Sequence, residues 1–386
     1  MEKVVYLDNN ATTAVAPEVF EAMKPFLTTS YGNPSSIHSF GGKVRRDLDR
    51  AREQVARMLG ADASEIVFTG CGSESDNAAI MGALELAGPS RKHVITTRVE
   101  HEAVIQVGHW LAGHGYDVTE TGVDTRGALD LAELESAIRD DTALVSVMWA
   151  NNETGVVYPI EKIAELVKSR GVLFHTDAVQ SVGKIPVDLG KVPVDLLALS
   201  GHKLHAPKGV GVLFVRKGID LPAYLRGGHQ EAGRRAGTEN VAGIVGLGAA
   251  AELAMSDMEE VGAREERLRD KLESGLIESC PDVRINGANR LPNTLNVSFE
   301  YVEGESILLM LNDLGICASS GSACTSGSLD PSHVLQAMKV PHSAAHGSIR
   351  FSLSRYTTDE EIDYVLEHVP GIINRLREIS PFVTNE

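Results

Sequence analysis

Short apolar runs alternate with longer amphipathic segments through the first two-thirds of the chain. The runs are rich in Val, Ile, Leu and Phe and are bounded by polar or glycine-rich residues, which favours strands. They cover residues 65–69, 94–97, 143–148, 173–174, 196–199 and 211–215. Strands that alternate with helices are typical of a mainly parallel sheet with helices packed on its faces. The pattern therefore predicts an α/β fold with a mainly parallel central sheet.

The pattern changes in the last third of the chain. The apolar stretch 241–255 predicts a buried helix, and a separate charged helix is expected over about 257–278. Because the chain exceeds the length that one hydrophobic core usually holds, we expect two domains. Residues 15–255 would form a large domain, and residues 1–14 with 256–386 a smaller one.

The smaller domain is predicted to have an α+β composition. Its expected strands cover residues 294–299 and 348–352. An amphipathic helix over about 359–376 closes the chain, and Thr358 is its predicted N-cap residue.

Composition and charge narrow the function. A formal charge of −17 argues against a nucleic-acid partner, because such binding relies on clustered Lys and Arg. The longest mostly apolar stretch carries Glu252 and is shorter than the ~20 residues of a membrane-spanning helix, so no membrane role is expected. The N-terminus lacks the pattern of a secretory signal, and the four cysteines lack C-x-x-C or zinc-finger spacing. We therefore expect a cytoplasmic protein.

Polar and glycine-rich residues follow the apolar runs where the predicted strands end. They occur at residues 70–73, 100–101, 151–152, 177 and 200–203. In a mainly parallel sheet the carboxyl ends of the strands meet at one edge, where ligands bind. The sequence therefore predicts that one cleft collects these residues.

Lys203 and Asp177 are the strongest candidates for chemistry in that cleft. A lysine in a dry or cationic environment loses its proton more easily and can form a Schiff base, and a buried acid can keep a pyridine nitrogen protonated. Pyridoxal phosphate requires this pair. Taken alone, Lys203 fits better a surface lysine whose stem packs and whose head lies in water.

The segment Gly70–Asn77 joins a strand to a helix that starts near Ser73. Amide groups at a helix start attract a phosphate, and glycines let an anion approach the backbone. An ordinary N-cap, in which Ser73 holds its own helix, explains the segment equally well. We interpret Cys71 as a small packed residue.

Three histidines follow predicted strands or lie within them. His101 could stack on a cofactor ring and carry a proton near neutral pH. His202 could bind the cofactor phosphate. Each of His101, His175 and His202 also fits a hydrogen-bonded side chain without a role in chemistry.

Neutral amides and one arginine could bind a substrate. Asn151, Asn152 and Gln180 could contact a carboxylate or a phenolic oxygen, although turn geometry also explains the Asn pair. Arg350 interrupts an apolar strand, and burying a guanidinium is costly unless it meets a carboxylate. An amino-acid substrate supplies that carboxylate, and an ion pair with the preceding or following helix is the structural alternative.

Cys324 lies in the small-residue stretch 318–328, which we expect to form a flexible loop. An exposed thiol becomes a nucleophile when a base or positive potential stabilises its thiolate. Combined with a cofactor that activates amino acids, such a thiol indicates attack on a substrate atom instead of simple transamination. If the substrate is cysteine, the target is its sulfur.

Several motifs that occur in order resemble the cysteine desulfurases, which belong to the class-V aminotransferases. They are residues 6–13 (YLDNNATT), 68–76 (FTGCGSESD), 151–155 (NNETG), 175–180 (HTDAVQ), 200–203 (SGHK), 234–238 (RRAGT) and 319–326 (SSGSACTS). The resemblance extends from Tyr6 to about Pro381. The long Ser/Gly segment around Cys324 is similar to the NifS and IscS branch, and residues 204–211 and 326–333 look more like NifS.

The resemblance implies a fold-type I enzyme that binds pyridoxal 5'-phosphate and acts as a homodimer. Lys203 would carry the cofactor as a Schiff base, Asp177 would face the pyridine nitrogen, Gln180 the phenolic oxygen and His101 the ring. The residues implied to hold the phosphate are Gly72, Ser73, Ser200, His202 and, from the other subunit, Thr238.

The resemblance also implies the reaction. Asn152 and Arg350 would fix the carboxylate of L-cysteine, and Cys324 would take its sulfur as a persulfide while alanine leaves. The persulfide would supply iron–sulfur cluster assembly, for nitrogenase or more generally, through a scaffold protein or another acceptor. Cys324 would then share its sulfur transiently with a scaffold-bound cluster. A selenocysteine lyase, and a docking scaffold or sulfur relay with little activity of its own, are the alternative functions.

Overall fold

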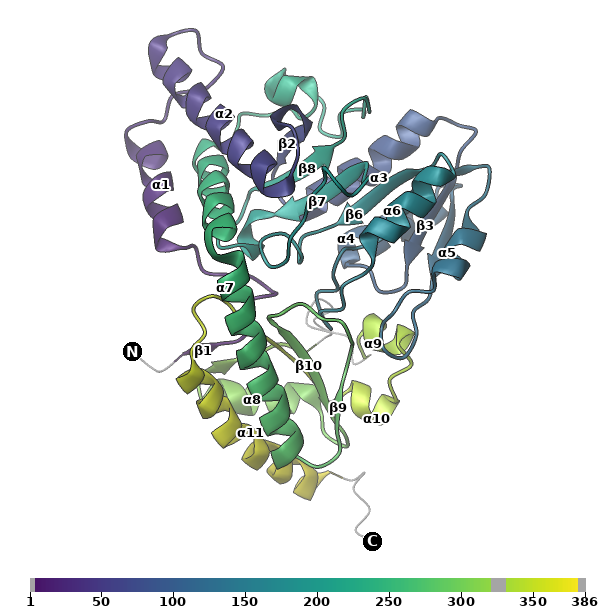
Figure 1. Ribbon diagram of the computed structural model, residues 1–386, viewed down its shortest axis with the longest axis vertical. Coiled ribbons are helices and arrows are strands. Elements are labelled where there is room, and N and C mark those ends of the chain that lie inside the picture. The colour runs from purple at the N-terminus through teal and green to yellow at the C-terminus, as the bar shows by residue number, and fades with distance from the viewer. Residues whose placement is uncertain (1–3, 321–330, 381–386) are drawn as a thin grey trace.

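The structure is a computed structural model that describes residues 4–320 and 331–380. A seven-stranded sheet in the order β2-β8-β7-β6-β5-β3-β4 forms its larger part (Figure 1). Only β8 runs against the other strands of this sheet. The strands are β2 (Ile66–Thr69), β3 (His93–Thr97), β4 (Asp117–Thr121), β5 (Thr142–Ser146), β6 (Leu173–Asp177), β7 (Leu196–Ser200) and β8 (Gly211–Val215). The predicted mainly parallel sheet is confirmed.

Helices cover both faces of this sheet, which explains why every strand except β4 is buried along almost its whole length. On β8, Val212 and Phe214 pack into one core with α1, α2, α6 and α7, whereas Leu213 and Val215 pack into another with α3 and α4. The helices of this part are α1 (Pro17–Thr28), α2 (Ser39–Leu59), α3 (Gly72–Ala87), α4 (Glu102–Ala112), α5 (Leu131–Ala137) and α6 (Ile160–Ser169), with the short 3-10 helices η1 (Ala63–Glu65), η2 (Gly201–Lys203) and η3 (Gln230–Gly233).

Strand β4 is an element that the hydrophobic pattern does not predict. Its sequence, DVTET, is polar, and most of its residues are partly or fully exposed. It lies at the edge of the sheet, where only β3 pairs with it. An edge strand needs fewer apolar side chains than a central one, so its signal in the sequence is weak.

A second, smaller group of elements surrounds its own core. Its antiparallel sheet has the order β12-β10-β9, and the short strand β1 pairs in parallel with β11 beside it. The elements around this core are β1 (Val5–Tyr6), β9 (Val283–Ile285), β10 (Thr294–Phe299), β11 (Ile316–Cys317), β12 (Ser348–Ser352), α8 (Gly304–Asp313) and α11 (Asp359–Ile379). The short helices α9 (His333–Ala337) and α10 (His342–Ala345) come between β11 and β12 in the chain, but their buried side chains pack into the large core. Thr358 caps α11 and forms a capping box with Glu361, as its predicted role requires.

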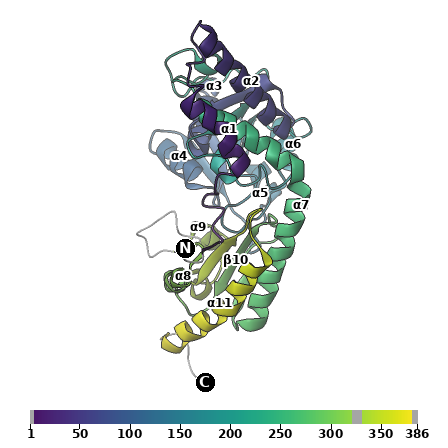
Figure 2. The ribbon, with the colours of Figure 1, turned by 90° about the vertical axis from the view of Figure 1, so that its left-hand side faces the viewer.

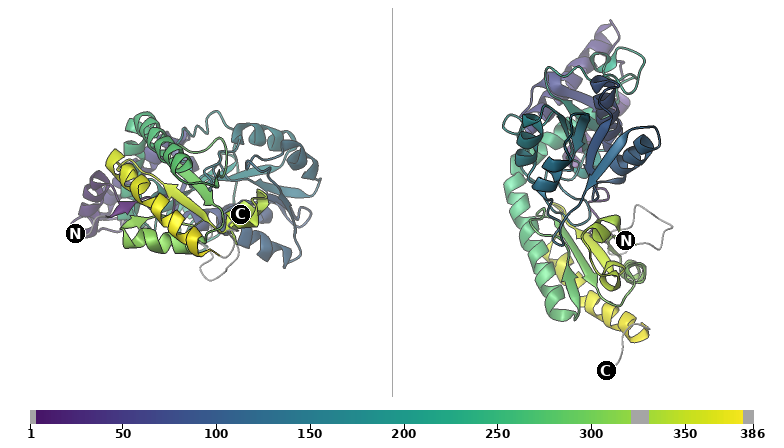
Figure 3. Two further views of the ribbon diagram at one scale, coloured as in Figure 1. Left: turned by 90° about the horizontal axis from the view of Figure 1, so that it is seen from below. Right: turned by 90° about the vertical axis from the view of Figure 1, so that its right-hand side faces the viewer.

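Helix α7 (Val241–Ser279) joins the two groups as one continuous helix of 39 residues (Figure 2). The expectation of two separate helices was wrong, because no residue between 255 and 257 breaks the backbone pattern. Ala250 and Ala254 pack into the large core, and Leu268 and Leu272 pack into the small one. Figure 3 shows α11 beside the far end of α7. The domain division at residue 255 stays a prediction, since the helix passes through it.

Within the described residues, α7 is also the one helix that is long and apolar enough to cross a membrane. Half of its apolar window is buried inside the protein. In the structure this window packs against α1 and α2, which is the environment of a core helix.

Gly347 provides a test of the packing that positions β12. A Cβ atom at this position would lie 2.0 Å from the Phe299 carbonyl oxygen and 2.8 Å from that of Val302. Since both atoms belong to the backbone, Gly347→Ala should lower the free energy of unfolding by about 3 kcal/mol in urea denaturation. Gly371→Ala is the control: no atom lies within 4 Å of its new methyl group on α11, so it should stabilise by about 0.5–1 kcal/mol. Equal stability of the two variants would contradict this packing.

Candidate active site

A cavity of about 370 Å³ lies at the carboxyl ends of the central strands. Ten of the residues singled out in the sequence line it, so the structure brings them together: Gly72, Ser73, His101, Asn152, Asp177, Gln180, Ser200, His202, Lys203 and Arg350. Thr238 does not line this cavity. It lies in a separate pocket of about 190 Å³ with Arg235 and Glu239. Its predicted place in the site of a second subunit stays a prediction. Cys324 lies outside the described residues.

Lys203 enters the cavity from η2, directly after β7. Its Nζ donates hydrogen bonds to the carbonyl oxygens of Asn10 at 2.5 Å and Ala11 at 2.8 Å. It is therefore no longer best described as a surface lysine with its head in water. The N-terminal segment that supplies these carbonyls is a partner that the sequence does not indicate.

Asp177 ends β6 and is buried. Its carboxylate accepts a hydrogen bond from the Val179 amide at 2.8 Å. Burial raises the pKa of Asp177, and the nearby His101 and Lys203 oppose that rise. A cationic ring nitrogen beside this carboxylate would be a further group that favours its ionised form.

Helix α3 begins beneath the cavity at Gly72. Cys71, not Ser73, is its N-cap residue, since its sulfur accepts from the Glu74 amide at 3.4 Å. The interpretation of Cys71 as a packed residue was also wrong, because it is exposed and lines the cavity. Ser73 is exposed too and is not engaged as the cap, so its hydroxyl is available to a ligand. A Cβ on Gly72 would lie 2.8 Å from the Val179 side chain, which leaves room only for glycine.

Two histidines line the cavity in neutral form. His101 caps α4, and its Nδ1 accepts from the Ala103 amide at 3.1 Å, which places the ring proton of the neutral form on Nε2. Burial lowers the pKa of His101. Burial and the neighbouring Lys203 lower the pKa of His202 to about 4. A neutral His202 can still donate one hydrogen bond to an anion.

The other histidine and the Asn pair separate into structural and cavity-lining residues. His175 is fully buried, and a hydrogen bond of 2.8 Å joins its Nδ1 to the hydroxyl of Ser146. Burial lowers the pKa of His175 to about 3. Asn151 shapes the turn, since its Oδ1 accepts from the amides of Glu153 and Thr154. Asn152 alone of the pair lines the cavity.

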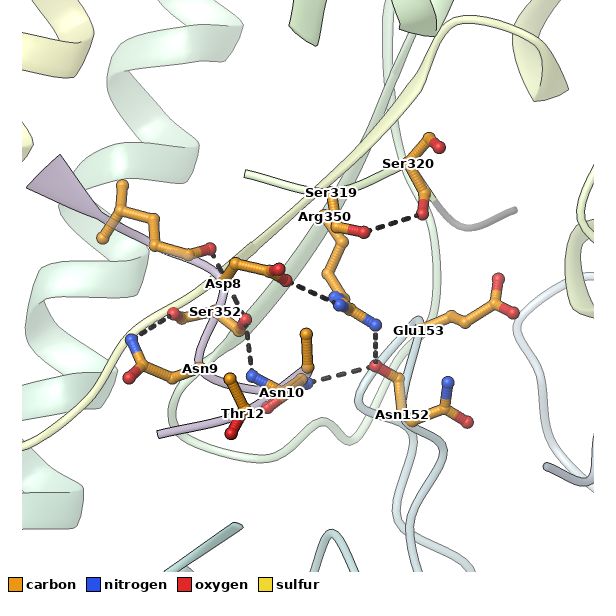
Figure 4. Close-up of polar contacts among 12 residues, drawn as sticks. Asp8, Asn9, Asn10, Thr12, Asn152, Glu153, Ser319, Ser320, Arg350 and Ser352 are labelled. Carbon is orange, nitrogen blue, oxygen red and sulfur yellow. Dashed lines mark hydrogen bonds and ion pairs between the residues drawn. The ribbon is translucent and has the colours of Figure 1, made fainter. Parts of the chain in front are cut away.

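Arg350 already has a carboxylate partner within the chain. Its Nη2 donates to Asp8 Oδ1 at 2.7 Å and its Nη1 to the Asn152 carbonyl at 3.0 Å (Figure 4). The structural alternative of an ion pair with a neighbouring helix was wrong, because Asp8 follows β1 near the N-terminus. The Arg350 Nε is buried without a hydrogen-bond partner. A ligand carboxylate could satisfy it.

Sequence reasoning assigned no role to two buried carboxyl groups below the cavity. Asp76 lines the cavity, and its Oδ1 has no hydrogen-bond partner, with His175 Nε2 3.5 Å away. Burial, with Asp177 and Glu100 nearby, raises the pKa of Asp76 well above its usual range. Burial also raises the pKa of Glu100 to about 8. The sequence signal was weak: Glu100 comes shortly after a predicted strand, whereas Asp76 lies within the helix that follows the Gly70–Ser73 turn.

The comparisons with known proteins agree with this geometry. A family model, aminotransferase class-V, matches residues 5–365. The chain belongs to this family. Members use pyridoxal phosphate, and the solved structure of a NifS-like protein with 42% identity matches 97% of this chain and 100% of its own, with a TM-score of 0.92. The resemblance and the fold-type I architecture are confirmed.

The most similar curated relatives include several cysteine desulfurases. One from Nostoc sp. is 59% identical over 385 residues, which are 99% of this chain and 96% of the relative. The cysteine desulfurase NifS of Azotobacter vinelandii is 58% identical over 381 residues, which are 98% of this chain and 94% of the relative.

The lining of the cavity fits pyridoxal phosphate. A lysine amine and a buried acid lie on its walls, and a helix of 16 residues begins there without a Cβ at its first residue. The hydroxyls of Ser73 and Ser200 and the imidazole of His202 suit a phosphate. A volume of about 370 Å³ is within the range of small-ligand sites.

Glu100 gives a pH test of the buried carboxyl groups. Its pKa is about 8 in the folded protein against 4.5 in the reference state, so between these values the folded state holds a proton that the unfolded chain has lost. The free energy of unfolding should therefore fall as pH rises from 5 to 8. Glu100→Gln removes this contribution, and its stability relative to the wild type should rise by about 3 kcal/mol or slightly more over that interval in urea titrations.

Glu53→Gln is the matched control, because Glu53 is exposed on α2. Its stability difference from the wild type should not change with pH. If the free energy of unfolding changed with pH in parallel for Glu100→Gln and the wild type, Glu100 would be ionised in the folded protein over this pH range.

Proposed function

We propose that this protein is a cysteine desulfurase that transfers sulfur from L-cysteine to Cys324 and releases L-alanine. Relatives with this name are 58–60% identical to the chain over almost its whole length. The observation that carries the proposal is the joint lining of one cavity by Lys203, Asp177 and Arg350. These residues suit a cofactor amine anchor, a ring-nitrogen partner and a carboxylate receptor.

Bound pyridoxal phosphate supplies an electron sink for the carbanion that forms when the substrate loses its Cα proton. Lys203 provides the amine to which the cofactor attaches, and this amine can hold the Cα proton once substrate has displaced it. Asp177 would hold the proton on the ring nitrogen. Gln180 would donate to the phenolic oxygen, and His101 would lie against the ring face.

The phosphate would be held by several short-range donors. They are the amide end of α3 at Gly72, the side chains of Ser73, Ser200 and His202, and Thr238 of the second subunit. The α3 N-terminus contributes a favourable dipole and free amide groups. These contacts fix the position of the cofactor relative to Asp177.

Asn152 and Arg350 orient the substrate through its carboxylate. Arg350 is 5% exposed and lines the cavity, so little water competes for its guanidinium. Its ion pair with Asp8 occupies Nη2, and the Asn152 carbonyl occupies Nη1. The unpartnered Nε is itself buried, so a substrate carboxylate would reach it only as neighbouring groups move, and a two-bond contact through Nε and Nη2 must displace Asp8.

The sulfur transfer needs no external oxidant. The Cys324 thiolate attacks the substrate sulfur, so that an S–S bond forms while the C–S bond breaks. The electron pair of the C–S bond stays with the carbon, which takes up a proton as alanine forms. The product on the enzyme is a persulfide at Cys324.

The wider setting of the enzyme is also part of the proposal. The relative from Azotobacter vinelandii is named NifS, which favours sulfur supply for iron–sulfur cluster assembly, for nitrogenase or in general. The persulfide would pass to a scaffold protein or another acceptor, with Cys324 briefly sharing its sulfur with a scaffold-bound cluster. We propose a cytoplasmic homodimer of two-domain subunits, divided near residue 255.

Replacing Cys324 tests the reaction. Cys324→Ala should lower sulfide and alanine production from L-cysteine at least about 100-fold, because the nucleophile is absent. The yellow cofactor band should remain, since the lysine and acid are intact. Cys71→Ser is the control: its thiol lines the same cavity, and serine can retain the α3 cap, so sulfur release should persist. If Cys324→Ala released sulfide at the wild-type rate, the proposal would be contradicted.

Replacing Asp8 tests the competition for Arg350. Asp8→Asn weakens the internal ion pair, so the KM for L-cysteine should fall about 3- to 10-fold, and calorimetric affinity for L-alanine should rise similarly. Asp363→Asn, which removes an exposed partner of Lys271, should leave KM as in the wild type. A higher KM for Asp8→Asn would mean that Asp8 orients Arg350 for the substrate instead of competing with it.

A further inference from the structure

Lys184 is a buried cation next to the cavity that the proposed mechanism does not use. The residue is half-buried overall, and burial is the largest influence on its ammonium group. This group donates to Gln180 Oε1 at 2.7 Å and to Asn10 Oδ1 at 3.0 Å. Both acceptors are neutral amide oxygens, so the positive charge is solvated without being cancelled by contact with an acid.

The first consequence concerns the orientation of Gln180. Its Oε1 accepts from Lys184, and its Nε2 donates to the Asn10 carbonyl at 2.9 Å. A reversed amide would direct an NH2 group at the ammonium and an oxygen at the carbonyl, and both contacts would be repulsive. The amide nitrogen therefore stays fixed, and it has a second hydrogen for a ligand in the cavity that Gln180 lines.

The second consequence concerns Lys203. Asn10 connects the two lysines, because Lys184 binds its side-chain oxygen and Lys203 its carbonyl oxygen. Both also line a small cavity of about 40 Å³ behind the main one, together with Glu265 of α7. Burial, and then repulsion from Lys203, lower the pKa of Lys184 to about 7. The repulsion acts equally on the amine of Lys203.

Other charged groups also face Lys184. Glu265 attracts it and Arg350 repels it. Burial raises the pKa of Glu265 to about 7, so this acid is a weak counter-charge near neutral pH. Asp257, Arg355 and His205 complete the titratable lining of the small cavity.

We propose that Lys184 is a positioning residue of the cofactor site: it holds the Gln180 amide as a donor toward the phenolic oxygen and, in its protonated form, places a second positive charge beside Lys203. The inference rests on the proposed use of pyridoxal phosphate. Both effects favour the form of the lysine-bound cofactor that lacks a proton on its nitrogen. Lys184 thus lowers the pH at which that nitrogen becomes deprotonated.

The test is a pH titration of the cofactor absorbance in the purified holoenzyme, without substrate. Lys184→Met removes both the donor and the charge and should raise the titration midpoint by about one pH unit. Lys184→Gln keeps a donor for Gln180 Oε1 but lacks the charge, so its midpoint should rise by less. Lys191→Met is the control, because Lys191 is an exposed lysine paired with Asp188, and its midpoint should equal that of the wild type.

The outcomes separate this inference from its structural alternative. If Lys184 only supported the fold, its variants would lose stability but titrate at the wild-type midpoint, which would overturn the inference. If Lys184→Met does not fold, the titration midpoint of Lys184→Gln decides between the two outcomes. If the wild type bound the cofactor but released no sulfur from cysteine, only the proposed function would be contradicted. If it bound no cofactor, both the proposed function and the inference about Lys184 would be overturned.

Discussion

The hydrogen bonds of Asn10 connect the two cores of the protein at the candidate active site. Its backbone amide binds Ser352 of β12, and its Nδ2 binds Thr294 of β10 and the carbonyl of Asn152. Its carbonyl oxygen accepts from Lys203 and Gln180, on the side of the large sheet. The residue is buried, so each lost bond would leave a polar group without water. Asn10 therefore helps to set the distance between the amine of Lys203 and the guanidinium of Arg350, which come from different cores, together with the bond from Arg350 to the Asn152 carbonyl.

Several ionisable groups at the edge of the cavity are buried, although burial disfavours their charged forms. Burial raises the pKa of Asp76 and Glu100 and lowers that of Lys184, so each group would be neutral more readily than in water. The hydrogen bonding is also incomplete, since Asp76 Oδ1, Glu100 Oε2 and Arg350 Nε are buried without partners. Proteins pair almost all buried polar atoms, and the exceptions carry a cost in stability. Their accumulation around one cavity indicates that this region is arranged for ligands and chemistry more than for stability.

The sequence predicts those features that depend on local patterns. The central strands contain short apolar runs and end in polar residues, so both the sheet and the cleft follow from the pattern around Asp177 and Lys203. The sequence does not predict features that depend on contacts between residues far apart in the chain. The edge strand β4 is held by β3 alone, α7 is continuous because it packs on two cores, and Arg350 finds Asp8 342 residues away. Lys184 shows no pattern of its own, because its burial results from contacts with the N-terminal segment.

The internal partners of the cavity cations change the physics of substrate binding. Arg350 is paired with Asp8 and Lys203 with two carbonyl oxygens, so an incoming carboxylate would exchange one hydrogen-bonded partner for another. The Coulomb attraction gained is then largely offset by the attraction lost, and net charge contributes little to affinity. What distinguishes a substrate from other anions is its geometry: it must satisfy the buried Arg350 Nε while its amine reaches Lys203. The spacing of those two groups, which Asn10 and the Arg350–Asn152 contact hold across the two cores, is thus the selective element of the site.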